Sequence, residues 1–520
     1  MSIMYLTQLL RRACQIAPAR RSTVDATRIR TWSETVDRVA RFAGFLLASG
    51  LEPGDRVAIL SLNNDRYFEA LFAIPWAGGV VVPINTRLSP AEVDGLLKDS
   101  GTRTLIVDHN FVEMIGSLAS ARDMRTILQF DGAHARVALP FDQVIAATEP
   151  AADRLRGGDE LAGIYYTGGT TGRPKGVMLS HANLVTNALN MSLGMGFESD
   201  AVYLHAAPMF HLSDSCSTYG LTMFGGTHVF MPRFDPLAFF GIVQDARITN
   251  VTLVPTMISM ILNHERVDEF DLSSLKRVCF GAAPMSNGLL QRVLDKLGHV
   301  RFQQAWGMTE LSPIATLMEA RFTTAEHLQS GRLRSCGQAV ATAEVAIVDE
   351  AGAELPRGTT GEVVVRGPIV MKGYWQQPET TAAVLRGGWM HSGDAGYMDE
   401  DGFVYIVDRL KDMIVTGGEN VYSAEVENTI SLMPEIAEVA VIGVPDDTWG
   451  EAVFACVVPR ESADLSPEQV IAFCREHLAA FKCPRGVQIL DRPLPTSAAG
   501  KVLKTELRRP FWSGRERGVN

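Results

Sequence analysis

The sequence contains little that would support a disulfide-stapled, metal-caged or membrane-spanning protein. Its seven cysteines are scattered singly, no Cys-x-x-Cys occurs and the count is odd, so we expect free thiols in a reducing cytosol. The eleven histidines lack a His-Glu-x-x-His pattern. The longest apolar stretch, residues 71–84, is interrupted by Pro75, Gly78, Gly79 and Pro83. It is also shorter than the roughly 20 residues that a membrane-spanning helix needs.

The charge balance and the composition are those of a globular, acidic protein. Among the 520 residues, 48 are Lys or Arg and 59 are Asp or Glu; the net charge of −11 disfavours non-specific nucleic-acid binding. The chain is 46% hydrophobic and 21% charged, which excludes a largely disordered, collagen-like or coiled-coil protein. Residues 1–15 have the pattern of an amphipathic surface helix, and their charges follow the apolar positions, unlike those of a secretory signal peptide.

Two regions of different pattern predict two domains. Up to residue 400, apolar runs alternate with helical patterns, which predicts an α/β fold with largely parallel sheets. The predicted strands there are residues 56–60, 79–83, 104–107, 251–254 and 277–280, and the predicted helices include residues 32–48 and 90–99. Beyond residue 408 the predicted strands are 413–415, 438–442 and 452–458, with helices at 423–432 and 466–478. We therefore expect a large N-terminal domain of layered α/β sheets, residues 1–408, and a small C-terminal α+β domain, residues 409–520, with a boundary at residues 408–411.

The strongest local signal is the segment YYTGGTTGRPKG, residues 165–176. Glycines let backbone N–H groups wrap phosphate oxygens, threonine hydroxyls add donors, and Lys175 adds a positive charge. The spacing is not that of a Walker A loop, and the flanking apolar runs predict that the loop joins two strands. Taken alone, such a Gly/Thr segment could also be a mobile hairpin.

This segment resembles the phosphate loop of the adenylate-forming superfamily, whose members include acyl-CoA synthetases, luciferases and the adenylation domains of peptide synthetases. Further segments match the superfamily's motifs in the same order, namely residues 280–285 (FGAAPM), 304–310 (QAWGMTE), 389–397 (WMHSGDAGY), 405–427 (YIVDRLKDMIVTGGENVYSAEVE) and 495–501 (PTSAAGK). Because the match covers nearly the whole chain, the chain is identified as a member of this superfamily.

The resemblance implies an enzyme that joins a carboxylic acid to the α-phosphate of ATP, releases pyrophosphate and then passes the acyl group to a thiol. Two anions meet in the first step, so the site must supply positive charge and oriented donors. By the resemblance, the catalytic residues are Lys501, which reaches the carboxylate and the α-phosphate, Thr309, which touches the α-phosphate, and Glu310. Glu310 is also the expected Mg²⁺ ligand, for which a carboxylate is a suitable hard donor.

The resemblance also implies a nucleotide site. The loop holds the β- and γ-phosphates, Trp306 stacks on adenine at a position where Tyr is more frequent, and Asp394 and Arg409 reach the ribose. The predicted ATP-binding residues are Thr167, Gly168, Gly169, Thr170, Thr171, Lys175, Gly281, Ala282, Ala283, Gln304, Trp306, Gly307, Asp394 and Arg409. Gly168 replaces the serine that is common in the loop, so we expect weaker phosphate binding.

A second set of implied residues serves the thiol step. Lys411 matches the hinge about which the small, mobile domain turns after adenylation. The predicted residues for coenzyme A (CoA) are Gly417, Gly418 and Glu419. The basic tail, with Lys501, Lys504, Arg508 and Arg509, is expected either to meet CoA phosphates or to form a solvated face.

The acid is less well defined by the sequence. Residues 208–211 (PMFH) match the strip that begins the acyl pocket, with His211 at its mouth, and Tyr219 is a candidate for an apolar lining rich in methionine. The predicted acyl-binding residues are Met209, His211, Met285 and Gly307. Amino-acid-activating relatives have an aspartate directly after the phenylalanine; Asp214, three residues beyond His211, keeps that alternative open.

These observations together predict an ATP-dependent, AMP-forming acid–CoA ligase for a medium- or long-chain fatty acid. The alternatives are a ligase for another apolar acid, such as an aromatic or short thioether acid, and an acyl-AMP ligase that loads a carrier protein. The expected small molecules are the acid, ATP, Mg²⁺ and CoA. We also expect a cytoplasmic homodimer without a nucleic-acid partner or transmembrane segment, and peripheral contact with a membrane is left open.

Overall fold

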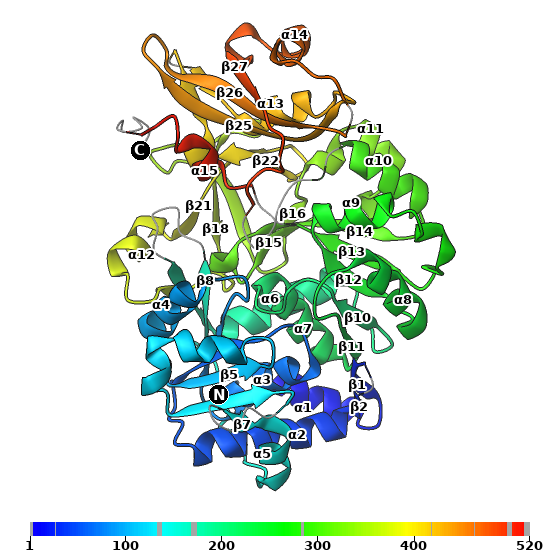
Figure 1. Ribbon diagram of the computed structural model, residues 1–520, viewed down its shortest axis with the longest axis vertical. Helices are drawn as coiled ribbons and strands as arrows, with labels where there is room; N and C mark the ends of the chain where they lie inside the picture. The colour runs from blue at the N-terminus through cyan, green and yellow to red at the C-terminus, as the bar shows by residue number, and fades with distance from the viewer. Residues whose placement is uncertain are drawn as a thin grey trace.

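The computed structural model describes residues 4–26, 28–132, 138–167, 174–281, 285, 287–417, 419–461, 463–496 and 502–513. Helices and strands alternate through most of this chain, and within these ranges the strands form four sheets, here called sheets I to IV (Figure 1). In the same ranges no helix is both long and apolar enough to cross a bilayer. The predicted α/β class is confirmed.

Sheet I carries the two strands that flank the Gly/Thr loop. Its strands in spatial order are β19 (Gly373–Tyr374), β9 (Lys175–Ser180), β8 (Leu161–Thr167), β4 (Val80–Pro83), β3 (Arg56–Leu60), β5 (Thr104–Asp108), β6 (Thr126–Phe130) and β7 (Leu139–Pro140). From β8 to β7 the neighbours run parallel, whereas β9 and β19 are antiparallel. The interior strands are buried almost throughout, which explains their continuous apolar sequences.

Of the four helices near sheet I, the first three begin directly after a residue whose side chain caps the first turn. The four helices are α2 (Trp32–Ala48), α3 (Asp65–Trp76), α4 (Pro90–Ser100) and α5 (Phe141–Ala147). Thr31 and Glu34 form a capping box at the start of α2, and Ser89 and Glu92 form another at the start of α4. Helix α4 ends at Gly101, whose φ of 64° is the left-handed conformation that glycine tolerates best.

Sheet II is the largest sheet. Its strands in spatial order are β16 (Gln338–Ala339), β15 (Ile314–Leu317), β14 (Arg301–Gly307), β13 (Arg277–Phe280), β12 (Asn250–Leu253), β10 (Val202–His205), β11 (Thr227–Phe230), β1 (Arg21–Asp25) and β2 (Arg28–Thr31). From β14 to β1 the neighbours are parallel, and the strands at both edges are antiparallel. The accompanying helices are α6 (His181–Met195), α7 (Leu212–Phe224), α8 (Pro236–Ala246), α9 (Pro255–Asn263) and α10 (Asn287–Lys296).

The predicted amphipathic N-terminal helix is α1 (Leu6–Ile16). Its apolar side chains, Leu6, Leu9, Leu10 and Ala13, are buried in the same hydrophobic cluster as the helices of sheet I. This apolar face is therefore used inside the protein and does not support the peripheral membrane contact that the sequence left open.

Sheet III differs from the largely parallel sheets expected before residue 400, because its strand pairs are all antiparallel. Its strands are β17 (Glu344–Val348), β18 (Gly361–Arg366), β21 (Trp389–Met398) and β20 (Leu385–Arg386), with β22 (Val404–Arg409) paired to β21. Tight turns make this possible: Gly387, Gly388 and Gly402 have φ values of 60°, 80° and 81°, which glycine adopts without steric cost.

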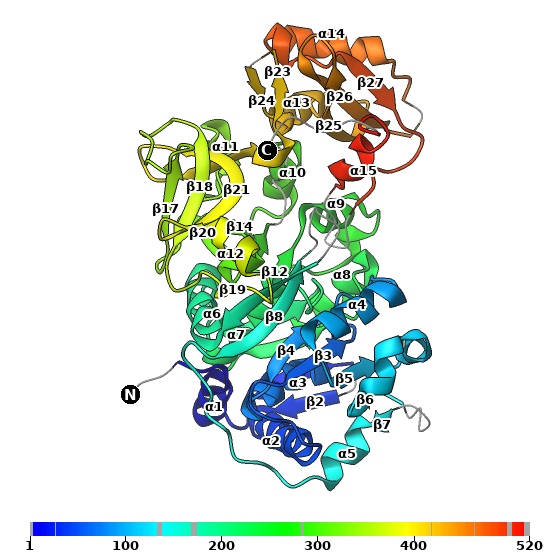
Figure 2. The same cartoon turned by 90° about the vertical axis from the view of Figure 1, so that its left-hand side faces the viewer.

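Sheet IV and its helices gather at one end of the molecule (Figures 1 and 2). Its strands are β24 (Glu419–Val421), β23 (Ile414–Thr416), β26 (Gly450–Pro459) and β25 (Ile436–Asp446), with β27 (Gly486–Ile489) paired to β26. The helices here are α13 (Ser423–Ile430), α14 (Pro467–His477) and α15 (Lys504–Arg508). Between β22 and β23 lies the short 3₁₀ helix η7 (Leu410–Asp412). The division into domains 1–408 and 409–520 stays a prediction.

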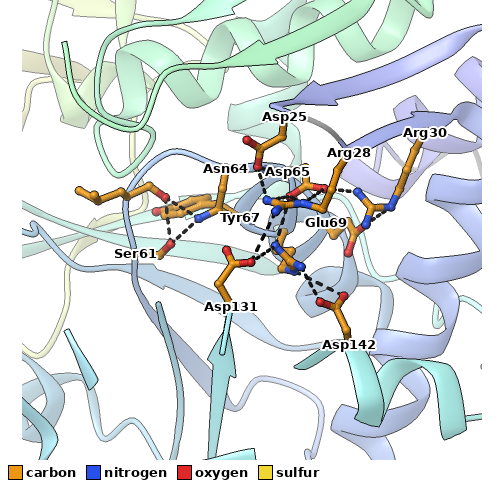
Figure 3. A network of polar contacts seen from close by, with 12 residues as sticks. Asp25, Arg28, Arg30, Ser61, Asn64, Asp65, Tyr67, Glu69, Asp131 and Asp142 are labelled. Atoms are coloured by element: carbon orange, nitrogen blue, oxygen red, sulfur yellow. Dashed lines mark hydrogen bonds and ion pairs between the residues drawn. The ribbon is translucent and has the colours of Figure 1, made fainter. Parts of the chain in front are cut away.

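A network of buried and half-buried charges links sheet II to the helices of sheet I (Figure 3). We call it the arginine–carboxylate network; it consists of Arg28, Arg30, Arg38, Arg66, Asp25, Asp65, Glu69, Asp131 and Asp142. Arg28 Nη2 on β2 lies 2.9 Å from Asp65 Oδ1 on α3, and Arg38 Nε on α2 lies 2.6 Å from Glu69 Oε1 on α3. Buried carboxylates are tolerated here because each has an arginine partner.

Burial raises the pKa of two carboxylates of this network, Asp25 and Glu69. Burial and the neighbouring Asp65 carboxylate raise the pKa of Asp25 to about 6. Burial acts in the same direction on Asp65, but hydrogen bonds and charge from Arg28 and Arg30 outweigh it and lower the pKa of Asp65 to about 2. Asp25 is therefore charged at neutral pH at a cost in folding free energy.

We expect Asp25→Asn to increase the free energy of unfolding at neutral pH by about 1–3 kcal/mol. The pKa of Asp25 is about 6 in the folded protein, above its ordinary value of 3.8. Protonation of Asp25 therefore stabilises the wild-type fold fully below pH 3.8, and this stabilisation is lost as the pH rises through about 6. Urea unfolding between pH 4 and 8 measures this: the difference between variant and wild type should grow up to about pH 6 and then stay constant. Asp37→Asn, in the exposed pair with Arg41, is the matched control. Parallel curves for wild type and Asp25→Asn would contradict the assignment.

Candidate active site

The Gly/Thr segment joins two antiparallel strands, as its sequence predicted. Thr167 ends β8, Lys175 begins β9, and the two residues pair across the hairpin. The predicted phosphate-loop residues Gly168, Gly169, Thr170 and Thr171 lie outside the described residues. Because Lys175 begins β9, which is paired with both β8 and β19, its position in sheet I is nevertheless fixed.

Tyr374, which the sequence analysis did not single out, brings two predicted site residues together. Its hydroxyl donates to Glu310 Oε1 at 2.8 Å, and Lys175 Nζ lies 5.1 Å from the centre of its ring. Burial and the charge of Glu310 raise the pKa of Tyr374 far above its ordinary value, so the phenol keeps its proton. Glu310 is only 6% exposed and lies with Thr309 in the 3₁₀ turn η4 (Thr309–Leu311), directly after β14.

Of the three residues predicted to hold adenosine, Asp394 contacts both Trp306 and Arg409. Trp306 Nε1 donates to Asp394 Oδ2 at 2.9 Å, and Arg409 Nε lies 2.7 Å from Asp394 Oδ1. Asp394 and Arg409 are also opposite each other in the β21–β22 pair. Residues from sheets II and III therefore meet at this point.

The remaining described adenine-side residues lie at the carboxyl ends of adjacent parallel strands. Gly281 follows β13, and Gln304 on β14 pairs with Phe280. A side chain at Gly281 would place its Cβ 2.7 Å from the Ala305 carbonyl oxygen, so only glycine fits this close backbone approach. Ala282 and Ala283 lie outside the described residues.

Three buried asparagine side chains form hydrogen bonds to the main chain of loops near the site. Each side-chain amide donates to two carbonyl oxygens: Asn63 to His205 and Ala207, Asn187 to Leu311 and Ile314, and Asn183 to Pro368 and Val370, all at 2.7–2.9 Å. These loops lie next to the acyl strip, Glu310 and Tyr374 respectively. Sequence reasoning missed the asparagines because their partners lie more than a hundred residues away along the chain.

The predicted acyl-binding residues do not all come together. Asn63 also accepts from the Met209 main-chain N–H at 2.7 Å, and His211 packs against Phe210 with ring centres 4.4 Å apart. Met209 is buried in the hydrophobic cluster of sheet I, together with Tyr219, whereas Met285 is buried in the cluster of sheet II. Met209 and Met285 thus belong to different hydrophobic clusters, and the role of residues 208–211 in acyl binding stays a prediction.

Asp214 cannot serve the amine-binding alternative. It is completely buried in the first turn of α7. One of its carboxylate oxygens lies 2.6 Å from His205 Nδ1, and the other accepts from the Tyr203 hydroxyl at 3.3 Å. His205 contacts His228, whose pKa is held far below its ordinary value by burial and by His205. Asp214 is therefore a structural residue in a buried series of polar contacts. The amino-acid-activating alternative, which depended on Asp214, loses its support.

Two residues of the basic tail, Lys504 and Arg508, form ion pairs within the protein, which neither expectation for the tail included. Lys504 Nζ lies 2.7 Å from Glu427 Oε1, and the buried Arg508 lies 2.7 Å from Asp412 Oδ1, next to the predicted hinge residue Lys411. These two cations are satisfied by carboxylates because α15 packs beside η7 and α13. Arg509 is exposed, as a solvated face requires.

The predicted CoA loop turns at Gly417, whose φ is 60°. Its N–H donates to the Trp449 carbonyl at 2.8 Å, and an added Cβ would lie 2.5 Å from the Trp449 ring. Glu419 begins β24 and is exposed. Gly418 and Lys501 lie outside the described residues.

Two family models match this sequence. Residues 10–375 match the model described as AMP-binding enzyme, and residues 425–501 match the model described as AMP-binding enzyme C-terminal domain. The chain belongs to the AMP-binding enzyme family. The predicted superfamily is thereby confirmed, and the segment between the two matched regions contains η7.

Several AMP-binding enzymes are similar over nearly their whole length. Feruloyl-CoA synthases from an Amycolatopsis species and a Streptomyces species are each 42% identical, covering 92% of this chain and 94% of their own. The fatty acid–[acyl-carrier-protein] ligase ScoC of Streptomyces coeruleorubidus is 36% identical, covering 92% and 91%. The crystal structure of ATP-bound MatB from Rhodopseudomonas palustris superposes with a TM-score of 0.89 at 33% identity, covering 98% of this chain and 99% of that one.

We expect Tyr374→Phe to lower kcat/KM for pyrophosphate release about tenfold, because Glu310 loses a donor worth about 1.5–3 kcal/mol to a charged acceptor. The Mg²⁺ concentration for half-maximal rate should rise in the same assay. Tyr405→Phe is the matched control, since its hydroxyl also donates to a carboxylate, Asp399, at 3.2 Å but within sheet III. An unchanged Mg²⁺ titration for Tyr374→Phe would contradict a role in placing Glu310.

Proposed function

We propose that this AMP-binding enzyme is an ATP-dependent acid–CoA ligase that forms an acyl-adenylate. The acid carboxylate attacks the α-phosphorus, a carboxyl O–P bond forms, and pyrophosphate leaves. The CoA thiol then attacks the acyl carbon, its proton is released, and AMP leaves. The observation that carries the proposal is the contact of Tyr374 with both Glu310 and Lys175. The hydrogen bond from Trp306 to Asp394 supports it at the proposed adenosine side.

The residues of this site fit a magnesium–nucleotide substrate. Among the described residues there is no group of three or more His, Cys, Asp or Glu that could enclose a metal. Mg²⁺ bound to a nucleotide needs only one or two carboxylates besides phosphate oxygens, so Glu310 alone is sufficient. When bound, the ion would neutralise charge on the phosphates. Thr309 and Lys501 are proposed to contact the α-phosphate, and Asp394 and Arg409 the ribose.

The acid is proposed to be apolar, and two kinds of acid deserve testing. The feruloyl-CoA synthases at 42% identity favour an aromatic acid, whereas the expected medium- or long-chain fatty acid stays a prediction. The similarity to ScoC, at 36% identity, keeps a carrier protein as the second candidate acceptor. The homodimer, the cytoplasmic location and the hinge at Lys411 also stay predictions.

An acid panel tests the proposed function directly. Ferulic acid, indoleacetic acid and fatty acids of increasing length are supplied with ATP and Mg²⁺, and pyrophosphate and CoA thioester are scored separately. We expect both products with at least one apolar acid. Pyrophosphate without CoA thioester, together with acylation of a carrier protein, would replace CoA by the carrier. No pyrophosphate with any acid would contradict the proposal.

Lys501→Ala separates the two half-reactions. Because its charge is needed only while the carboxylate meets the phosphate, we expect adenylation to fall by about three orders of magnitude or more. Conversion of a supplied acyl-adenylate to the thioester should stay within about threefold of wild type. Lys504→Ala is the matched control, since that lysine is paired with Glu427. Near-normal pyrophosphate release by Lys501→Ala would remove the assignment.

A further inference from the structure

We propose that the indole N–H of Trp306 positions Asp394 for the ribose of ATP, so that one side chain serves both the base and the sugar. The inference rests on the proposed function, because it concerns the adenosine part of the same site. It assigns to Trp306 a role that stacking on adenine does not require.

Asp394 is held by a hydrogen bond from one sheet and an ion pair from another. It is 4% exposed; Oδ2 accepts from Trp306 Nε1 at 2.9 Å, and Oδ1 lies 2.7 Å from Arg409 Nε. A buried carboxylate needs such partners to stay in place. The Arg409 side chain is 39% exposed, so water weakens its hold, whereas Trp306 reaches the carboxylate from the packed side.

The geometry of an indole allows both roles at once. Its N–H lies in the plane of the ring and donates at the edge, so the faces stay available for stacking. A carboxylate can accept about four hydrogen bonds, so contacts with Trp306 and Arg409 are compatible with accepting ribose hydroxyls. Phenylalanine would offer a similar face but no donor at its edge.

The strand that carries Trp306 has a backbone irregularity directly after this residue. The pairing of β14 with β15 shifts register between Trp306 and Gly307, and such irregularities redirect side chains. A Cβ on Gly307 would lie 2.0 Å from the Pro313 carbonyl oxygen, so the irregularity requires glycine. Gly307 therefore helps to orient the Trp306 side chain by permitting this irregularity.

Nucleotide binding by calorimetry, without acid or CoA, tests the inference on the full chain. We expect Trp306→Phe to weaken ATP binding about tenfold but 2′-deoxy-ATP binding only about twofold, because the deoxy sugar has already lost a contact with Asp394. In an Asp394→Asn background, Trp306→Phe should have less than about a twofold effect. Trp389→Phe is the matched control; Trp389 lies on the same strand as Asp394 and packs against Arg366.

Equal weakening of ATP and 2′-deoxy-ATP, or additive effects of the two substitutions, would overturn the inference and leave Trp306 as a stacking residue. Failure of wild type to bind ATP would instead overturn the proposed function. If Trp306→Phe does not fold, nitrogen-15 spectra of the wild-type indoles decide the question. Asp394→Asn should then shift one indole N–H signal and speed its exchange with water; unchanged signals would overturn the inference.

Discussion

The hydrogen bond from Tyr374 to Glu310 joins the two large sheets at the site where the nucleotide is proposed to bind. Tyr374 belongs to sheet I, and Glu310 follows the last parallel strand of sheet II. A shift of one sheet against the other would separate Lys175 from Glu310 and leave a buried carboxylate without its donor, which is costly. The arginine–carboxylate network joins the same sheets through β2 and α3. Two polar links thus hold the two sheets in one geometry, and only the first of them includes a residue of the proposed site, Glu310.

Burial also decides which charged residues are free to act. Asp214, with both oxygens engaged inside the protein, is a fixed part of the scaffold, although its position in the sequence allowed an amine-binding role. Arg508 is likewise taken up by Asp412. In contrast, Asp394 and Glu310 are contacted by hydroxyl, indole and guanidinium groups of residues at the proposed nucleotide site. Asp394 and Glu310 thus differ from Asp214, because their partners are residues that match nucleotide-binding motifs or contact such residues.

Much of the fold could be read from the sequence, because the signals were local. The predicted strands at 56–60 and 277–280 and the helix at 32–48 coincide with β3, β13 and α2. The antiparallel character of sheet III was missed, since its short strands are separated by glycine turns and their pairing is not a local property. Within the site, motifs led to Trp306, Glu310 and Asp394, but Tyr374 and the three asparagines act across long sequence separations that no local pattern records.

The hydrogen bonds between Asn63 and main-chain atoms have a consequence for which positions of the strip can be substituted. The amide holds the carbonyls of His205 and Ala207 and the N–H of Met209, none of which changes when a side chain is replaced. The path of the strip is thus independent of the chemistry displayed along residues 208–211. Side chains along residues 208–211 can therefore be exchanged while Asn63 keeps the main chain of the strip in the same path.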